Sequence, residues 1–322
     1  MPDIREEIQR LKAEQDAVIL AHYYQRPEIQ DIADIVGDSL ALAQAATRVT
    51  NRVIAFCGVH FMAETAAILN PDRIVLLPDA TAGCPMADMC SAEDLAIAKH
   101  RYHRAVVVCY VNSTAGVKAL SDLCCTSSNA VAVLRSIPAD REILFVPDRW
   151  LGTWAATQTG RTNFALVNAR AETGNSEAEG PQVFLWAGHC PTHHNIMAEE
   201  LEKTASEHPD ALICAHPECR TDIVNRAHFV GSTAGIIKFV AASDKRKFII
   251  ASEKGMIHAI NKVAPDKLCI PASQRSTCLN MKKVTLENLA DSLRTLTPRV
   301  VVDPETAGKA LGSITRMLEL SR

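Results

Sequence analysis

The sequence predicts an α/β protein in which one βα unit is repeated three times. Three short apolar runs open the three units, and each has the length of a buried strand: Ala17–Ala21, Ala105–Cys109 and Ala211–Ala215. Polar and aromatic residues follow each run at once, and helical stretches separate the runs. Short apolar runs that alternate with helical stretches predict βα units and parallel sheets.

The helix after each of these strands begins near a hydroxyl residue. These residues are Ser39, Ser127 and the pair Ser232 and Thr233, and small residues follow each of them. Ser and Thr are favoured caps because their hydroxyl accepts from free N–H groups of the first turn. We therefore expect each of them to cap a helix.

A second strand follows in each unit, and each unit closes on a cysteine. The second strands are predicted within 52–57, 142–148 and 247–253. Ser39 and Cys84 are 45 positions apart, and so are Thr233 and Cys278, whereas Ser127 and Cys190 are 63 apart. The excess of 18 falls largely at the polar stretch 171–180, which predicts a loop insertion. The units predict three domains, at 1–95, at 96–195 with the insertion, and at 196–322 with an additional C-terminal helix.

Composition limits the class of protein. The chain has 322 residues, 48% of them hydrophobic, which suits packed α/β domains. The net charge is −3 and the acidic and basic residues are interspersed, so we expect no nucleic-acid partner. The N-terminal segment has neither a cationic nor an apolar signal region, and no apolar run has the length of a membrane span. We expect a cytoplasmic protein without a membrane partner.

Cysteine is unusually frequent, with 11 residues. No Cys-x-x-Cys pair occurs, which weighs against zinc-ribbon, thioredoxin and ferredoxin sites. Cys57, Cys109, Cys214 and Cys269 lie in or beside apolar runs and are predicted to be buried. A threefold repeat can instead bring Cys84, Cys190 and Cys278 to one point. Three thiolates on a four-iron cluster leave one iron without a protein ligand, as a catalytic metal requires.

Several further motifs occur in a distinctive order along nearly the whole chain. They are Ala21–Gln25, Gly37–Ser39, Gly83–Ala87, Tyr110–Ala115, Cys125–Ser127, His216–Glu218, Gly231–Thr233 and Cys278–Lys282. In these motifs the chain resembles the quinolinate synthases of the NadA type. The resemblance implies three homologous three-layer αβα domains with parallel sheets, related by a pseudo-threefold axis. It also implies a [4Fe-4S] cluster near that axis, held by Cys84, Cys190 and Cys278.

The resemblance implies the reaction as well. Iminoaspartate and dihydroxyacetone phosphate give quinolinate, phosphate and water, with the open iron acting as a Lewis acid. The substrates carry two carboxylates and one phosphate, and helix N-termini bind anions. We expect the carboxylates at Ser39 and Ser127 and the phosphate at Ser232 and Thr233.

Acid–base groups are expected at the strand ends. We assign Glu218 as general base, and Tyr24 with His22 to the aldose–ketose isomerisation. Tyr110 and Asn112 would hold the intermediate by hydrogen bonds. His216 and His193 are further candidates, because histidine transfers protons near neutral pH.

Other functions remain open at this point. A three-cysteine iron–sulfur dehydratase could act on another small hydroxy acid, and an iron–sulfur sensor would bind a partner. A structural zinc site at Cys190 with His193 and His194 lacks a second ligand pair at metal spacing. The resemblance also implies functional coupling to an aspartate oxidase or dehydrogenase that supplies iminoaspartate. The chain lacks the Cys-x-x-Cys pair that some relatives carry near the last cluster ligand, which argues against a thiol switch at that place.

Overall fold

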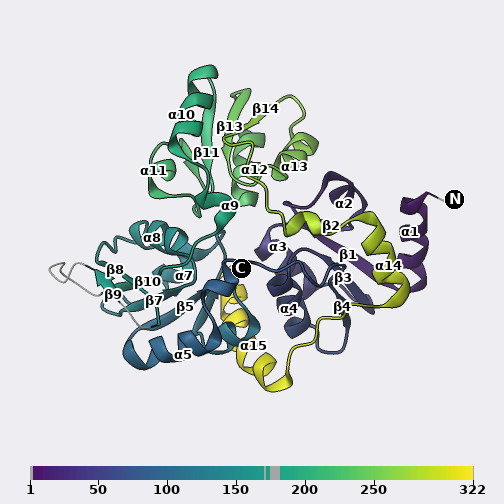
Figure 1. The fold of residues 1–322 in the computed structure, drawn as a ribbon, viewed down its shortest axis with the longest axis horizontal. Helices are drawn as coiled ribbons and strands as arrows, with labels where there is room; N and C mark the ends of the chain where they lie inside the picture. Colours follow the sequence, from purple (N-terminus) through teal and green to yellow (C-terminus); the bar gives the residue numbers. More distant parts are fainter. Residues whose placement is uncertain (1–2, 170–171, 175–181, 322) are drawn as a thin grey trace.

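Three separate β-sheets, one for each predicted repeat, lie around a common centre in the computed structural model of the chain (Figure 1). The structure describes residues 3–169, 172–174 and 182–321. The predicted first and second strands of all three units are present. The α/β class and the three parallel sheets are therefore confirmed.

The first sheet has the strand order β2-β1-β3-β4, and its pairings are parallel. Its strands are β1 (Ala17–His22), β2 (Ile35–Gly37), β3 (Val53–Cys57) and β4 (Ile74–Leu76). Its helices are α1 (Ile4–Glu14), α2 (Pro27–Ile32), α3 (Ser39–Ala46) and α4 (His60–Leu69).

The second sheet has the order β6-β5-β7-β10-β8-β9. Its strands are β5 (Val106–Tyr110), β6 (Leu123–Cys125), β7 (Ile143–Val146), β8 (Phe164–Val167), β9 (Glu172–Gly174) and β10 (Val183–Trp186). Its helices are α5 (Ala92–Arg101), α6 (Ala115–Ala119), α7 (Ala130–Arg135) and α8 (Arg149–Thr157).

The third sheet has the order β12-β11-β13-β14. Its strands are β11 (Leu212–Ala215), β12 (Phe229–Val230), β13 (Lys247–Ala251) and β14 (Leu268–Pro271). Helix α9 (Pro191–His194) follows Cys190 at the end of the second unit, and the helices of the third are α10 (Ala198–Glu207), α11 (Thr221–Val224), α12 (Thr233–Ala242) and α13 (Met256–Val263). The four-strand order of the first sheet recurs here, and it recurs as β6-β5-β7-β10 in the second, which supports the threefold repeat.

The extra length of the second unit adds strands to its sheet. β8 and β9 lie beyond β10, and β9 pairs antiparallel to β8. The prediction of a loop was therefore wrong for Glu172–Gly174, which adds one antiparallel edge strand to an otherwise parallel sheet. The rest of the predicted insertion, at 171 and 175–180, lies outside the described residues.

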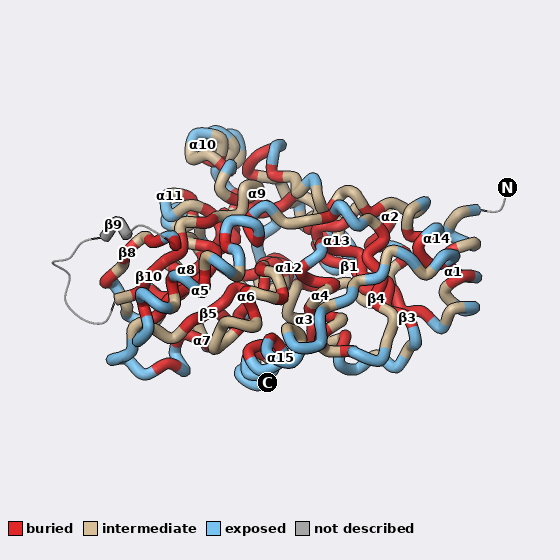
Figure 2. The backbone as a smooth tube through the Cα atoms, turned by 60° about the horizontal axis from the view of Figure 1, so that its bottom comes forward, coloured by how far each residue is buried: buried red, intermediate tan, exposed pale blue. Residues whose placement is uncertain are grey.

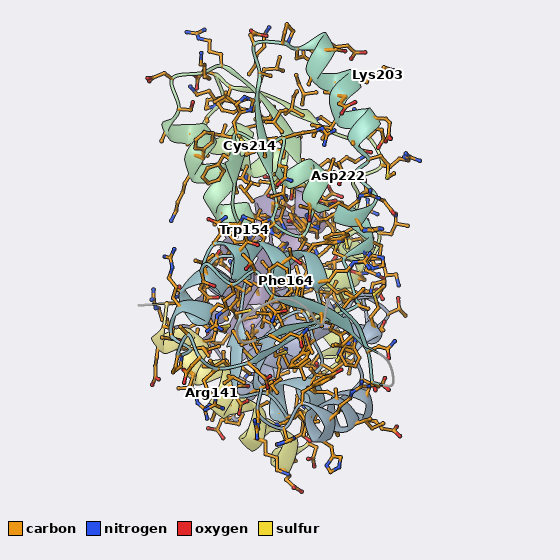
Figure 3. All side chains as sticks on the ribbon, turned by 90° about the vertical axis from the view of Figure 1, so that its left-hand side faces the viewer. Arg141, Trp154, Phe164, Lys203, Cys214 and Asp222 are labelled. Carbon is orange, nitrogen blue, oxygen red and sulfur yellow. The ribbon has the colours of Figure 1, made fainter. Side chains whose placement is uncertain are left out.

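In the first and third sheets, alternate residues of the central strands enter different cores, as expected for a sheet covered on both faces. In β1, Ile19 packs in a cluster with Ile8 and Leu289, from α1 and from α14 (Leu286–Thr295). The neighbouring residue Leu20 packs in the large central cluster instead. Figure 2 shows buried strands inside a more exposed outer shell, and in Figure 3 Cys214 of β11 lies within such a core. The first and third lobes thus bury apolar side chains on both faces of their sheets.

The last two helices leave the third lobe. α14 packs against α1 and β3 of the first lobe, and α15 (Pro304–Glu319) packs against α6 and β6 of the second and α4 of the first. The predicted domain boundaries stay predictions, but by packing these helices belong to the first two lobes. Among the described residues, no helix combines the length and the hydrophobicity needed to cross a membrane.

Candidate active site

A cavity of about 740 Å³ receives residues from all three sheets. It lies at the carboxyl ends of the strands, where α/β sheets bind their ligands. Thirteen of the fourteen predicted site residues line it: His22, Tyr24, Ser39, Cys84, Tyr110, Asn112, Ser127, Cys190, His193, His216, Glu218, Thr233 and Cys278. Ser232 lies just behind the wall and is buried.

Each of the three cavity cysteines is followed by a short helical turn. Cys84 precedes a turn at Ala87–Met89, Cys190 precedes α9, and Cys278 precedes a turn at Met281–Lys283. Backbone N–H groups two and three residues on donate to Cys84 and Cys278, and the N–H three residues on donates to Cys190. The repeat therefore extends to the environment of each sulfur.

Burial dominates the acidity of these thiols. It raises the pKa of Cys84 to about 12 and raises the pKa of Cys190 and Cys278, and the N–H donors oppose this only in part. A metal ion deprotonates a coordinating thiol outright. Three partly buried thiols with N–H donors on one cavity therefore fit the soft, thiolate-bound cluster that the resemblance implies.

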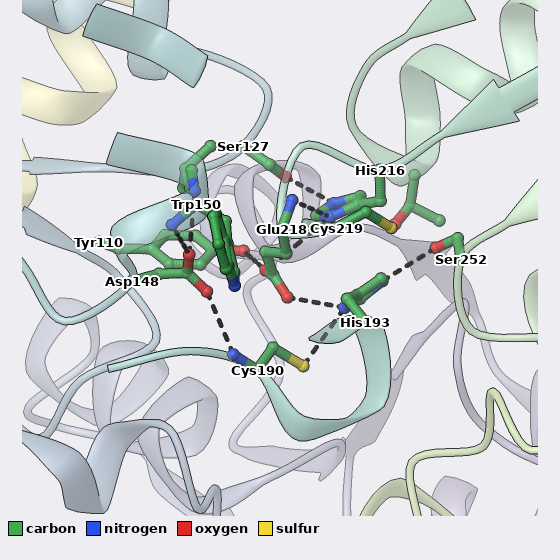
Figure 4. A network of polar contacts seen from close by, with 12 residues as sticks. Tyr110, Ser127, Asp148, Trp150, Cys190, His193, His216, Glu218, Cys219 and Ser252 are labelled. Carbon is green, nitrogen blue, oxygen red and sulfur yellow. Dashed lines mark hydrogen bonds and ion pairs between the residues drawn. The ribbon is translucent and has the colours of Figure 1, made fainter. Parts of the chain in front are cut away.

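Glu218 is the centre of the polar network in Figure 4. Its carboxylate accepts from the Tyr110 hydroxyl and from His193 Nδ1, the latter at 2.8 Å. Burial raises the pKa of Glu218, but His193, His216 and the two hydrogen bonds outweigh burial and hold it well below its usual range. Burial and the Glu218 charge raise the pKa of Tyr110 well above its usual value. The site thus pairs an ionised carboxylate with a protonated phenol.

His22 and His216 hold their protons on the same nitrogen. The N–H of Tyr24 donates to His22 Nδ1 at 3.1 Å, and the N–H of Glu218 donates to His216 Nδ1 at 3.3 Å. In a neutral ring the proton then lies on Nε2. Burial lowers the pKa of His22 to about 4 and that of His216 to about 3, so both rings are neutral at pH 7.

A hydroxyl cluster joins the first and third lobes. The Tyr24 hydroxyl lies 2.8 Å from Thr233 Oγ1 and 3.1 Å from Ser252 Oγ. Ser252 Oγ also lies 3.1 Å from His193 Nε2. Burial raises the pKa of Tyr24 well above its usual value, so its phenol stays protonated.

The expected helix caps were wrong at two of three places. Asp38, and not Ser39, caps α3, since its carboxylate accepts from the N–H of Ala41. α7 begins only at Ala130, so Ser127 does not cap it, and its hydroxyl lies 3.2 Å from His216 Nε2 instead. Ser232 does cap α12, by accepting from the N–H of Gly235 at 3.1 Å. The hydroxyls of Ser39 and Ser127 are therefore not used as caps at the cavity.

Three residues of the site had no predicted role: Asp38, Ser252 and Arg275. Asp38 accepts from the hydroxyl of Ser128 at 2.6 Å, which joins the first and second lobes. Among the described residues that line the cavity, Arg275 carries the one fixed positive charge, and it pairs with Glu200 at 2.8 Å. The position of Asp38 beside Ser39 was a usable signal. Ser252 and Arg275 had none, because their partners are distant in sequence.

One group of metal-ligand atoms was also unexpected. Ligand atoms of Cys190, His193 and Glu218 lie within 4.8 Å of one another. The sequence offered His194 as a companion of His193, but the His194 ring accepts from Trp150 Nε1 at 3.0 Å. Asn112 adds a buried carbonyl oxygen that has no hydrogen-bond partner within the described chain. Such an orphan acceptor on a cavity wall suits ligand binding.

Known proteins resemble the chain over nearly its full length. The family described as "Quinolinate synthetase A protein", NadA, matches residues 6–319. A "Quinolinate synthase" of Methanoregula boonei is 47% identical over 98% of both chains. One of Desulforudis audaxviator is 48% identical over 98% of this chain and 97% of its own. "Quinolinate synthase 1" of Methanosarcina acetivorans is 46% identical with the same coverage.

Proposed function

Because this chain belongs to the quinolinate synthase (NadA) family, we propose that its three-lobed cavity condenses iminoaspartate with dihydroxyacetone phosphate. The products are quinolinate, phosphate and water. As a family member, the chain is a synthase of NAD biosynthesis. The observation that carries the assignment to this cavity is that Cys84, Cys190 and Cys278, one from each repeat, all line it.

These three cysteines would hold a [4Fe-4S] cluster with one open iron. When bound, the cluster would supply Lewis-acid chemistry at that iron, which eases loss of water from a bound hydroxyl. The N–H donors at each sulfur and the shared cavity support this cofactor. All other roles fall to side chains.

The anionic groups of the substrates would be bound by Ser39, Ser127 and Thr233, and Asn112 would hold the intermediate by a hydrogen bond. The Ser39 hydroxyl at the start of α3 does not cap the helix, so it can bind a substrate group. The buried oxygen of Asn112, which has no partner within the described chain, can accept from a substrate N–H or O–H. Thr233 is the first residue of α12, where the helix dipole favours a phosphate. Ser232 would support that place from behind as the cap. His216 Nε2–H would orient Ser127.

Proton transfer would centre on Glu218. Its carboxylate is ionised, as a general base must be, and it lies on the cavity wall. Tyr110 and His193 hold it in place and can pass protons to and from it. Tyr24 and His22 would move the proton of the isomerisation, since both carry their hydrogen at neutral pH.

The supply of iminoaspartate belongs to the same proposal. Its source would be an aspartate oxidase or dehydrogenase, and we place the reaction in the cytoplasm.

Iron and acid-labile sulfide per chain, measured on anaerobically purified protein, test the proposal. We expect about four of each in the parent and a loss in Cys84→Ala, Cys190→Ala and Cys278→Ala. Cys269→Ala, in β14 and outside the cavity lining, is the matched control and should keep its iron. Zinc in place of iron would favour a site at Cys190, His193 and Glu218 and would overturn the cluster. Quinolinate formation is then assayed on the loaded protein.

A further inference from the structure

Two buried carboxylates occupy equivalent places in the second and third repeats. Asp148 lies two residues after the end of β7, and Glu253 lies two residues after the end of β13. Both side chains are fully buried. In the first repeat the corresponding position, two residues after the end of β3, is Val59, which has no carboxylate.

Each carboxylate binds the backbone of a cavity cysteine. Asp148 Oδ2 accepts from the N–H of Cys190 at 3.2 Å, as Figure 4 shows. Glu253 Oε1 accepts from the N–H of Cys278, also at 3.2 Å. In both repeats the contact joins the segment after the second strand to the cysteine that closes the unit. The two contacts differ only in the length of the acidic side chain.

The second oxygen of each carboxylate is anchored as well. Asp148 Oδ1 accepts from the N–H groups of Trp150 and Leu151 at 2.8 and 2.9 Å, where it caps α8. Glu253 Oε2 accepts from the N–H of Gly255 at 2.7 Å. Lys282 Nζ lies 3.1 Å from Glu253 Oε1 and adds an ion pair. Neither carboxylate can turn without losing a second contact.

The first repeat achieves a related link without a carboxylate. The N–H of His60 donates to the carbonyl of Ala82 at 2.8 Å, two residues before Cys84. The segment after the second strand is thus tied to the cysteine loop in all three repeats. In the second and third repeats that tie involves a buried acid, which is costly to keep unless it is well bonded. Burial indeed raises the pKa of both Asp148 and Glu253.

We propose that Asp148 and Glu253 are positioning residues for the metal-binding thiols of Cys190 and Cys278. Each carboxylate fixes the backbone N–H of its cysteine, which directs the sulfur into the cavity. The sulfur is then left to accept from the N–H groups of the following turn. Hydrogen bonds to sulfur tune an iron–sulfur centre, and groups that orient metal ligands sustain metal affinity. This inference rests on the proposed function, since it assumes that these thiols hold the cluster.

Amide variants test the inference without removing the helix cap. In Asp148→Asn the remaining oxygen can still cap α8, because Asn is as good a cap as Asp. The new amide N–H then faces the N–H of Cys190, so only that contact is lost. Glu253→Gln likewise leaves a single oxygen, which cannot accept both from the N–H of Gly255 and from the N–H of Cys278. Asp122→Asn is the matched control, because Asp122 accepts from the N–H of Val107 at 2.8 Å, on the edge of the second sheet away from the cavity.

The measurement is the rate at which a ferrous chelator removes iron under anaerobic conditions, with thermal unfolding of each apo variant beside it. We expect iron loss about 10- to 100-fold faster in Asp148→Asn and Glu253→Gln, and unchanged in Asp122→Asn. Apo unfolding should match the parent within the range of the control. The electron paramagnetic resonance spectrum of the reduced cluster should also change in both variants.

If Asp148→Asn and Glu253→Gln lose iron at the same rate as the control Asp122→Asn, the inference is overturned. It would also fall if the two variants unfold earlier as apo protein while their loaded clusters keep the parent rate and spectrum, since the carboxylates would then serve the fold alone. A parent protein without iron would instead refute the proposed function, so the two failures are distinguishable.

Discussion

His22 and His216 are related by the repeat, and each accepts at Nδ1 from the backbone N–H two residues further on. Each therefore presents Nε2–H as a donor, and both rings are neutral at pH 7. The same backbone hydrogen bond thus sets the tautomer of two histidines from different lobes.

Replacing Glu218 should stop turnover without emptying the cluster. Glu218→Gln keeps the size of the side chain but removes the ionised form that accepts from Tyr110 and His193. We expect the turnover rate to fall about 10²- to 10⁴-fold, with iron per chain unchanged. Steady-state assay of quinolinate with iron analysis checks this, and near-normal turnover would refute the base assignment.

Acid should destabilise the apo protein partly through His216. Burial lowers the pKa of His216 to about 3, although Glu218 opposes the effect, so the unfolded chain takes up this proton at higher pH than the folded chain. Stability attributable to His216 is then present above the unfolded pKa of about 6.5 and is lost as pH falls toward the folded value. Between pH 7 and 5 the loss is about 2 kcal/mol.

The apo variant His216→Gln should lose that part of the pH dependence. Denaturant unfolding at pH 7 and pH 5 measures it, and His100→Gln on the exposed end of α5 is the control. A His216→Gln protein with the parent's full decline in stability would contradict the lowered pKa.

Arg275 should act on substrate capture more than on chemistry. It supplies the fixed positive charge of the described cavity wall, and the substrates are anions. We expect Arg275→Ala to raise KM about five- to tenfold, with kcat little changed, since an exposed charge contact contributes about 1 kcal/mol. Glu200→Gln releases the arginine from its ion pair and should not raise KM. A fall in kcat at constant KM would assign Arg275 a different role.

Ser252 should matter more for activity than for stability. Its hydroxyl contacts Tyr24 and His193, and it is fully buried. Ser252→Ala should lower the free energy of unfolding by about 1 kcal/mol and reduce kcat more than tenfold. Ser313→Ala removes a buried hydroxyl that donates to the carbonyl of Lys118. It should show a similar stability cost with normal kcat, and equal kcat in both variants would argue against an active role for Ser252.

The strands could be predicted because buried β-runs are local and because three copies of one pattern reinforce each other. The caps could not be placed as well, since Asp38 and Ser39 are adjacent in sequence and only the geometry of the first turn decides between them. The strand β9 was missed because its short polar sequence carries no apolar alternation. The partners of α14 and α15 were also hidden, because an amphipathic helix does not specify which sheet it covers.

Most of the candidate site followed from the strand ends and the repeat. Ser252 and Arg275 did not, because each contacts a partner that is remote in sequence. The predicted roles of the site residues, the domain boundaries, the cytoplasmic location and the absence of a nucleic-acid partner stay predictions.

The return of α14 and α15 to the first two lobes has a consequence for biosynthesis. α1 and β3 leave the ribosome early, yet Leu289 and Leu293, which complete their core, are made only after the whole third lobe. The apolar faces of the first and second lobes therefore stay uncovered until residues 286–319 have been translated. A nascent chain of this protein therefore depends on its last residues to complete the cores of its first two lobes.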